Sequence, residues 1–348
     1  MTLSELSYYS RKSIPFIILG GVFFTVIFVV IMFLMRPSVP VAEQISALNT
    51  TFGPLPAPVF THKLDYPVGG TYELDNIEGK PISATDSAQV FFIPPKSTRF
   101  SYLQNIYTMA KNAGFNTERT PHALEDTTAV FDDGSQRLSI DITYFNFSYK
   151  YSYERSSLTF LNPQVVDETT IKDRAIRYLQ QLGKYPAELA QGTQHIVYMR
   201  FNTELKEFEV VENPQDANVV EVDFFGPDVN GEKEGYPIVS PKYFNSENYV
   251  VMSLSSLSPK VLKAQIKFFE KDEANIGIYP LKTGDEAWAE FNAGTGTIVS
   301  PGGTSYPIKI KKMFLGYFEP DTYQPYFQPV YVFLGDNNFA AYVPAVKN

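Results

Sequence analysis

The feature that most constrains this chain is an uninterrupted apolar run near its N-terminus. Residues Ile14 to Met35 carry no charge, and as a helix they would cover about 33 Å, enough to span a bilayer. Arg11 and Lys12 precede the run, whereas only Arg36 follows it closely. Because basic residues favour the cytoplasmic side, we predict a single-pass cell-membrane protein with its N-terminus inside and its C-terminal domain outside.

A cleaved signal peptide is the alternative interpretation of this run. The apolar region of a signal peptide normally holds about 7 to 15 residues and ends at a small-x-small cleavage site. The run here is longer, and Arg36 and Pro37 follow it directly. The pattern therefore favours an uncleaved transmembrane helix over 14–35, preceded by a cytoplasmic tail over 1–13.

Two small residues within the run suggest how this helix could meet another one. Gly21 and Thr25 are spaced as a small-xxx-small pair, which lets two membrane helices approach closely. They are our candidate residues for helix pairing in the membrane. The alternative is that small residues simply occur in membrane helices.

Charge and cysteine content limit the partners and chemistry of the outer part. Removing residues 1–36 takes away three basic groups and one acid, leaving 26 basic and 37 acidic residues, a net charge of −11. Such a surface repels phosphate backbones, so we expect no nucleic-acid partner. The chain has no cysteine, which excludes disulfides, thiolate metal sites and cysteine nucleophiles. Stability must therefore come from packing.

Proline and glycine signals divide the outer part into segments. Residues 36–58 hold five prolines among small and polar residues, which predicts an extended stalk. The folded part is too long for one small core, so we predict a first subdomain over 59–162, a second over 163–280 and a C-terminal unit over 281–348.

A helix followed by strands recurs three times along these segments. Apolar residues at helical spacing occur over Ser97–Gly114 and Asp167–Gly183, and Thr283 and Glu286 form a capping box at the start of a third helix. Each helix leads into residues of high β propensity, for example Leu138–Tyr153. Because one helix on a small antiparallel sheet buries both apolar faces, we predict the α+β class.

The C-terminal unit also resembles a known family. The helix LKTGDEAWAEFNAGTGTIV (Leu281–Val299), the strand IKIKKMFLGYF (Ile308–Phe318) and the ending YFQPVYVFLGDNNFAAYVPAV (Tyr326–Val346) resemble the last repeat of YycH/YycI-type accessory proteins. The resemblance implies a single-pass membrane protein whose outer domain is built from PepSY-like helix-plus-sheet repeats. It also implies a protein without catalytic residues that tunes a membrane sensor kinase by contact. The long first segment, Val59–Tyr153, departs from the family, and uncharacterised bacterial single-pass membrane proteins with the same layout are an equally close match.

Motifs for common chemistry are absent from the sequence. There is no G-x-S-x-G, S-x-x-K or H-E-x-x-H motif and no phosphate-binding loop, so we expect no cofactor and no metal. His62, His122 and His195 are too widely spaced to form a local metal site. The alternating oxygen ligands of Asp228, Asn230, Glu232 and Glu234 lack the bidentate glutamate of a calcium loop, which favours an ordinary solvated turn.

Adjacent acids offer the remaining route to catalysis. Glu125 with Asp126, Asp132 with Asp133, and Asp272 with Glu273 are the pairs that a glycosidase could use. Such a site needs two carboxyl groups from different elements that face each other, whereas neighbouring acids on a loop usually face water. We therefore predict no catalytic residues and no enzyme activity.

A group of aromatic residues near three prolines is the candidate interaction patch. Aromatic side chains anchor protein interfaces with little loss of entropy. The alternative is that they fill the core and cover a sheet edge. The five residues of the predicted patch are Tyr317, Phe318, Tyr323, Tyr326 and Phe327.

These observations lead to one functional hypothesis and two alternatives. We predict a membrane-anchored extracytoplasmic module that binds another membrane or envelope protein, such as a sensor kinase. The first alternative is a structural or assembly subunit of the envelope, which leaves a homo-oligomer open. The second is an envelope hydrolase that uses carboxylates brought together by the fold.

Overall fold

The computed structural model describes Phe28 and residues 48–64, 71–82, 85–155, 157–229, 235–256, 259–303 and 307–347. The predicted tail, the predicted membrane helix apart from Phe28, and the pairing residues Gly21 and Thr25 lie outside these ranges. Among the described residues, no helix has both the length and the apolar character needed to cross a membrane.

The predicted α+β class is wrong, because the chain is mostly β-sheet. Across the described ranges, eighteen strands form three sheets, and four short α-helices accompany them. The prediction failed because the strands that follow each helix do not close into separate small sheets. They join strands that are distant in sequence, as the pairing of β6 (Phe147–Tyr151) with β12 (Val261–Ile266) demonstrates.

The largest sheet is antiparallel, and it crosses the predicted subdomain boundary at 162–163. It combines strands from both sides of that boundary. In spatial order its nine strands are β3 (Ala123–Glu125), β4 (Thr128–Asp132), β5 (Gln136–Asp141), β6, β12, β11 (Tyr249–Ser253), β9 (Val219–Phe225), β7 (Thr193–Asn202) and β8 (Glu207–Val210).

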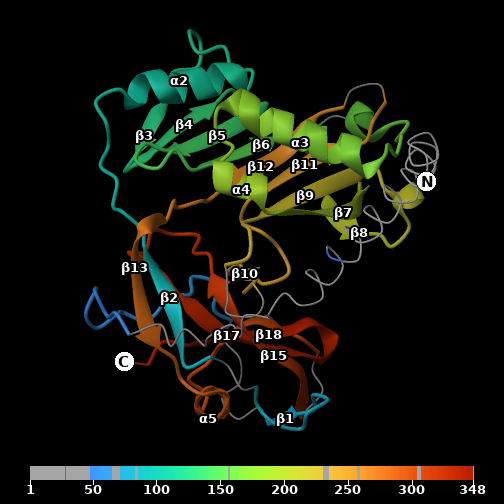
Figure 1. Ribbon diagram of the computed structural model, residues 1–348. Coiled ribbons are helices and arrows are strands. Elements are labelled where there is room, and N and C mark those ends of the chain that lie inside the picture. Colours follow the sequence, from blue (N-terminus) through green and yellow to red (C-terminus); the bar gives the residue numbers. More distant parts are fainter. Residues whose placement is uncertain are drawn as a thin grey trace, which may run out of the picture. The chain divides into compact units, whose positions relative to one another are not determined.

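Two helices cover one face of this nine-stranded sheet (Figure 1), α2 (Tyr102–Asn112) and α3 (Glu168–Leu182). The apolar residues Ile171, Ala175, Leu179 and Leu182 recur every three or four positions, so they share the buried face of α3. The Asp167 side chain caps its first turn and Gly183, at φ 77°, ends it, which confirms the helix predicted over 167–183. The short helix α4 (Ala187–Gln191) follows.

Two smaller sheets are built from the chain on either side of the nine-stranded sheet. The six-stranded sheet contains β1 (Tyr72–Leu74), β15 (Ile308–Phe318), β17 (Pro329–Gly335), β18 (Phe339–Pro344), β14 (Thr297–Pro301) and β10 (Ile238–Val239). The three-stranded sheet contains β13 (Asp272–Pro280), β2 (Ser87–Phe92) and β16 (Tyr326–Phe327). The chain thus leaves the smaller sheets after β2, builds all nine strands of the nine-stranded sheet, and returns in β13 (Figure 1). Among the described strands of this stretch, only β10 joins a smaller sheet, by pairing with β15.

Helix α5 (Gly284–Asn292) packs its Ala287 and Phe291 into the core of the six-stranded sheet. The capping box predicted for it is confirmed. The Glu286 amide donates to Thr283 Oγ1 at 3.2 Å, and the Thr283 amide donates to Glu286 Oε2 at 2.8 Å.

Replacing Thr283 with alanine should lower the free energy of unfolding by about 1 kcal/mol, because the Glu286 amide then loses its side-chain acceptor. Chemical denaturation of the purified chain measures this. The matched control is Thr203→Ala, at an exposed position on a turn. If both variants lose the same free energy of unfolding, the Thr283 side chain does not stabilise the start of α5.

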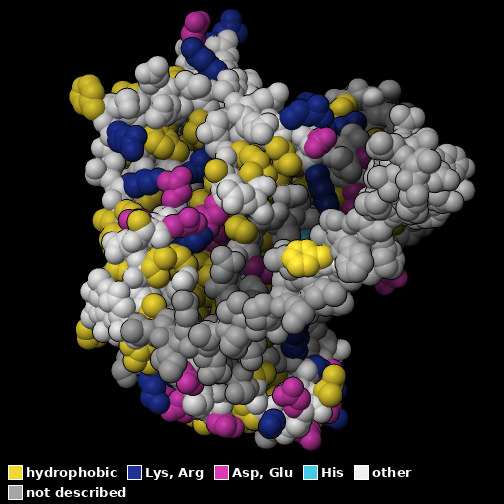
Figure 2. All heavy atoms as spheres, in the orientation of Figure 1, with side chains coloured by type: hydrophobic (Ala, Val, Ile, Leu, Met, Phe, Trp, Pro, Cys, Tyr) yellow, Lys and Arg dark blue, Asp and Glu magenta, His cyan; other side chains and the backbone are white. Residues whose placement is uncertain are grey.

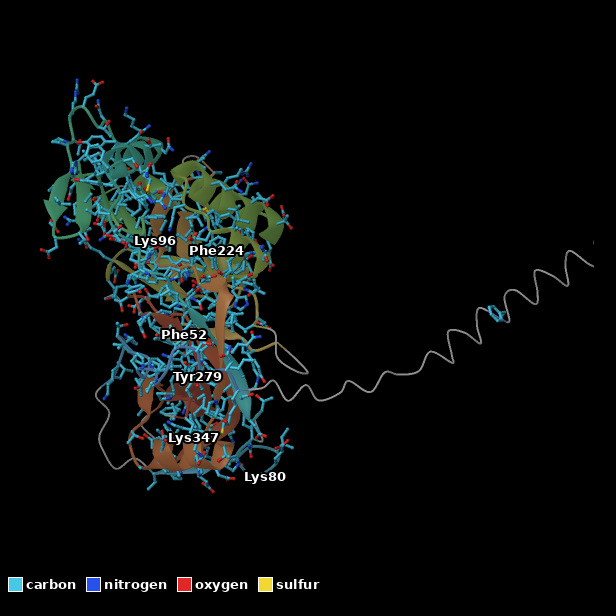
Figure 3. The ribbon with its side chains drawn as sticks, turned by 60° about the vertical axis from the view of Figure 1, so that its left-hand side comes forward. Phe52, Lys80, Lys96, Phe224, Tyr279 and Lys347 are labelled. Carbon is cyan, nitrogen blue, oxygen red and sulfur yellow. The ribbon has the colours of Figure 1, made fainter. Side chains whose placement is uncertain are left out.

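The described end of the predicted stalk does not extend away from the folded part. Asn49 and Ile278 of β13 exchange two backbone hydrogen bonds of 3.1 and 2.9 Å, and Leu55 is buried. Phe52 lies against Tyr279, whose hydroxyl accepts from the Phe52 amide (Figure 3). The apolar residues Phe52 and Leu55 overcome the extended tendency of the surrounding prolines. Residues 48–58 are therefore part of the folded body, and the prediction of a free stalk is wrong for them.

Candidate functional site

A pocket of about 380 Å³ lies between helix α3 and the hairpin of β11 and β12. Helix α3 contributes residues spaced three or four apart, which therefore lie on one side of the helix. The hairpin contributes residues on both sides of its turn, and β9 contributes one. The lining residues are Ile171, Arg174, Arg177, Tyr178, Gln181, Val220, Met252, Ser253, Leu254, Pro259, Lys260 and Val261.

The floor of this pocket is the apolar core of the nine-stranded sheet. Ile171, Val220, Met252 and Leu254 all belong to the core cluster beneath α2 and α3. The register of β11 against β12 shifts between Val251 and Met252, next to the pocket. Such an irregularity bends a strand locally. Here it falls at Met252, which lines the pocket under α3.

The rim of the pocket is cationic. Arg174, Arg177 and Lys260 are exposed, and none of them forms an ion pair with a carboxylate in the described part of the chain. The Arg177 Nε donates to the Asp173 carbonyl at 3.2 Å, and Lys260 Nζ donates to Tyr151 Oη at 3.0 Å. Figure 2 shows basic, apolar and acidic side chains over the region of α3. In a chain of net charge −9, this rim is a local positive feature.

Tyr178 lines the pocket and packs against the core of the nine-stranded sheet. Its hydroxyl oxygen is buried and has no hydrogen-bond partner among the described residues. Burial, and to a lesser degree the nearby Tyr149, raises the pKa of Tyr178 well above its usual value of 10. Tyr178 is therefore a neutral phenol at physiological pH and cannot act as a base.

The composition of the lining suits binding better than catalysis. The lining residues include no carboxylate and no histidine. The described chain also has no group of three metal-ligating side chains. The pocket can accept an apolar group and pair anions at its rim, and its lining holds neither histidine nor carboxylate, the commonest general bases.

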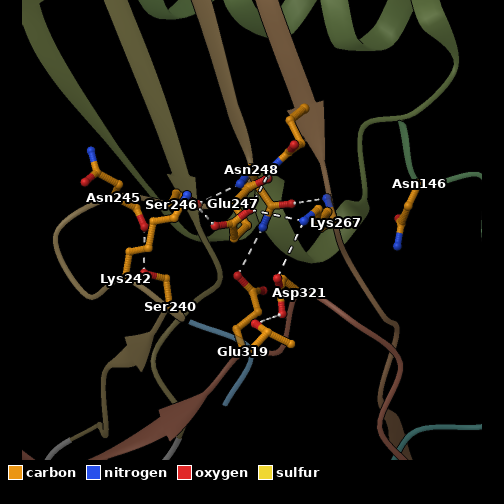
Figure 4. Close-up of polar contacts among 12 residues, drawn as sticks. Asn146, Ser240, Lys242, Asn245, Ser246, Glu247, Asn248, Lys267, Glu319 and Asp321 are labelled. Atoms are coloured by element: carbon orange, nitrogen blue, oxygen red, sulfur yellow. Dashed lines mark hydrogen bonds and ion pairs between the residues drawn. The ribbon is translucent and has the colours of Figure 1, made fainter. Parts of the chain in front are cut away.

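A second polar arrangement joins the nine-stranded sheet to the loop after β15 (Figure 4). The buried Asn248 donates through Nδ2 to Glu319 Oε2 at 3.1 Å, and its Oδ1 accepts from the Lys267 amide at 2.9 Å. Lys267 Nζ lies 3.5 Å from Glu247 and 3.6 Å from Asp321. We call these five residues the polar junction.

Two buried carboxyl groups stand out electrostatically. Burial raises the pKa of Glu319 to about 8, against the lowering effects of Lys271 and Asn248. Burial, and then the charge of Glu221, raises the pKa of Asp223 on β9 to about 8, and its Oδ1 has no hydrogen-bond partner among the residues that the structure describes. Both carboxyl groups are almost wholly inaccessible, and neither lines the pocket.

The sequence prediction missed these acids, although a signal was present. In VVEVDFF, Glu221 and Asp223 alternate with apolar residues, so they share one face of a strand. Glu319 has no comparable signal, because it follows the end of β15 and is buried only by tertiary packing.

The predicted aromatic patch is largely a core feature. Tyr317, Phe318 and Phe327 are buried, and Tyr317 and Phe327 stack with ring centroids 5.3 Å apart. Tyr326 is half-buried against Phe52. Tyr323 is exposed and stacks on Tyr144. The patch prediction is therefore wrong for Tyr317, Phe318 and Phe327. Tyr317 and Phe327 fill the space between the six- and three-stranded sheets, and Phe318 packs among other residues of the six-stranded sheet.

The structure does not bring the other candidates together. His122 Nδ1 lies 3.1 Å from Tyr107 Oη of α2. The exposed His195 is on β7 and packs against Phe225 of β9, so the two histidines have separate surroundings. Asp132 and Asp133 accept backbone amides of their own turn, as solvated turn residues do. In the suggested calcium loop, residues 230, 232 and 234 lie outside the described ranges.

Comparisons with known proteins add no assignment. No family model matches the chain, and no curated protein matches it. The crystal structure of an uncharacterized protein from Eubacterium rectale is similar, at 13% sequence identity and a TM-score of 0.37, over 80% of this chain and 89% of that one. A likeness at this score carries no argument about fold or function. The resemblance of Leu281–Val346 to YycH/YycI-type accessory proteins therefore stays a prediction.

Proposed function

We propose that the chain is a membrane-anchored extracytoplasmic accessory protein that acts by binding another membrane or envelope protein through the α3 pocket. The observation that carries this proposal is the pocket itself, with its apolar floor and a rim of three cations that form no ion pair with any described residue. A lining without acid or histidine favours binding over catalysis.

A protein partner fits this combination of groups. Arginine is enriched at protein interfaces, because its planar guanidinium pairs with carboxylates in a fixed geometry. Apolar pockets at the centre of an interface contribute most of the binding energy when a partner side chain fills them. A sensor kinase, the partner that the family resemblance implies, is one protein that could supply such a side chain.

The predicted anchor would keep the folded body within reach of the membrane. Asn49 is already bonded to β13, so only residues 36–47 link the folded body to the predicted helix. Fully extended, twelve residues span about 40 Å at most. The proposed partner is therefore itself in the membrane or close to it.

Affinity capture of the full chain from its native membrane tests this proposal. Val261 lines the pocket, so Val261→Arg should block it, and one partner protein captured by the wild type should be lost. The control is the same change at Val210→Arg, on the exposed edge strand β8, which should keep the partner. Melting curves verify that both variants fold. Capture that is equal in the two variants would refute the pocket as the binding site.

An envelope hydrolase is the second candidate; one observation favours it, and the inaccessibility of Asp223 counts against it. Glu221 and Asp223 lie two residues apart on one face of β9, and burial raises the pKa of both. Two carboxyl groups with raised pKa values are typical of acid–base sites. Release of soluble sugar from purified cell wall by the wild type, and its loss in Asp223→Asn, would support this candidate over the first.

A further inference from the structure

We propose that the α3 pocket recognises an acidic segment of its partner, with one apolar side chain on the pocket floor and carboxylates on Arg174 and Arg177. This inference rests on the proposed function and names the chemistry that its partner presents.

The spacing of the two arginines supports recognition of more than one carboxylate. Arg174 and Arg177 are three residues apart on α3, so their side chains leave the helix on neighbouring positions, roughly 5 to 6 Å apart at their β-carbons. Two acids close together in a peptide can each meet one guanidinium. Lys260 adds a third positive charge on the opposite wall of the pocket.

The acidic residues of α3 near the rim do not pair with its arginines, so the rim can bind anions of a partner. On α3, Glu168 lies 3.9 Å from Lys172 and is thereby partly neutralised. The nearest acid in sequence is Asp173, whose backbone carbonyl, rather than its carboxylate, accepts from Arg177. Elsewhere the chain is acidic, so an acidic partner would be repelled from most of the surface and attracted to this rim.

The size and composition of the pocket limit what can enter it. About 380 Å³ is near the lower end of the range for ligand pockets, roughly 300 to 1,000 Å³. The floor of Val220, Met252 and Leu254 is apolar. One large apolar side chain, flanked by acids that stay at the rim, fits both limits.

Fluorescence anisotropy with three labelled peptides tests the inference on the purified full chain in detergent. The first peptide has the sequence Asp-Glu-Phe-Asp-Glu, the second replaces its acids with amides, and the third replaces phenylalanine with serine. Only the first should bind well, and its affinity should fall at least tenfold in the double variant Arg174→Gln, Arg177→Gln.

A matched control separates the pocket from overall charge. The double variant Arg99→Gln, Arg119→Gln makes the same charge change at exposed positions outside the pocket, and it should bind the first peptide like the wild type. The pair Arg174→Lys, Arg177→Lys keeps the charge and should weaken binding less than the glutamine pair.

Several outcomes would overturn the inference while leaving the proposed function intact. The first is that the amide peptide binds as tightly as the acidic one. The second is that the Arg174/Arg177 and Arg99/Arg119 glutamine variants lose equal affinity for the acidic peptide. The third is that the wild type binds none of the peptides but still captures a partner that is lost in Val261→Arg. Displacement of the acidic peptide by phosphatidylglycerol vesicles would instead identify the rim as a lipid contact. If Val261→Arg and Val210→Arg instead capture the partner equally, the proposed function itself is refuted.

Discussion

Replacing Glu319 with glutamine should raise the free energy of unfolding by several kcal/mol at pH 9 and leave it almost unchanged at pH 5. The pKa of the buried Glu319 carboxyl is raised from 4.5 to about 8. Each pKa unit corresponds to about 1.4 kcal/mol, so ionising Glu319 costs the folded state on the order of 5 kcal/mol at most. Glutamine keeps an acceptor for the Asn248 amide but cannot ionise.

The sign of this effect follows from proton binding. Between pH 4.5 and about 8 the folded chain holds the Glu319 proton and the unfolded chain releases it, so stability falls as the pH rises through this window. Asp223, whose pKa is raised to about 8, contributes in the same direction and should keep part of the slope in the variant.

Urea denaturation at pH 5, 7 and 9, followed by circular dichroism, measures the Glu319 effect. The control is Glu118→Gln, at an exposed position, which should leave the stability curve parallel to that of the wild type. If Glu319→Gln also gives a parallel curve, the carboxyl is ionised in the folded chain and the account of the polar junction is wrong.

Replacing Phe291 with alanine should lower the free energy of unfolding by about 3 to 5 kcal/mol. This ring is 2% exposed and stacks on Phe333 with centroids 4.6 Å apart. It also meets Tyr72 at 4.3 Å, so it connects α5 to two strands of the six-stranded sheet. Its removal leaves a cavity that rigid strands on both sides cannot close.

The single tryptophan, Trp288, lies beside Phe291 and reports unfolding of this region by fluorescence. The control is Phe100→Ala, because the Phe100 side chain is fully exposed and its loss should cost less than about 0.5 kcal/mol. A loss for Phe291→Ala below about 1 kcal/mol would contradict the described packing of α5.

Local elements of this fold were predictable because their determinants are local. Asp167 and Gly183 bracket α3, and Thr283 and Glu286 start α5, through contacts within four residues. The apolar spacing of α3 likewise identifies its buried face without reference to the rest of the chain.

The arrangement of the sheets was not predictable, because it depends on pairs of distant strands. β6 and β12 are separated by more than one hundred residues, and alternation of side chains does not specify which strand is the neighbour. The same limitation explains the aromatic patch. Tyr317 and Phe327 look like interface residues in sequence, but the pairing of β16 with β2 buries them.

The pocket was unpredictable for a related reason. Arg174 and Arg177 have the pattern of an ordinary exposed helix face. Only the position of the β11–β12 hairpin gives them an apolar floor.

Site-specific photocrosslinking in the native membrane tests the proposal that the chain binds another protein through the α3 pocket. A photoreactive residue is placed at Gln181 on the pocket lining and, as the control, at the exposed Leu205, outside that lining. The expected result is one dominant foreign protein crosslinked from position 181 and absent from position 205. Equal products from both positions, or crosslinks only to further copies of this chain, would contradict the proposal, and the second result would favour a structural subunit.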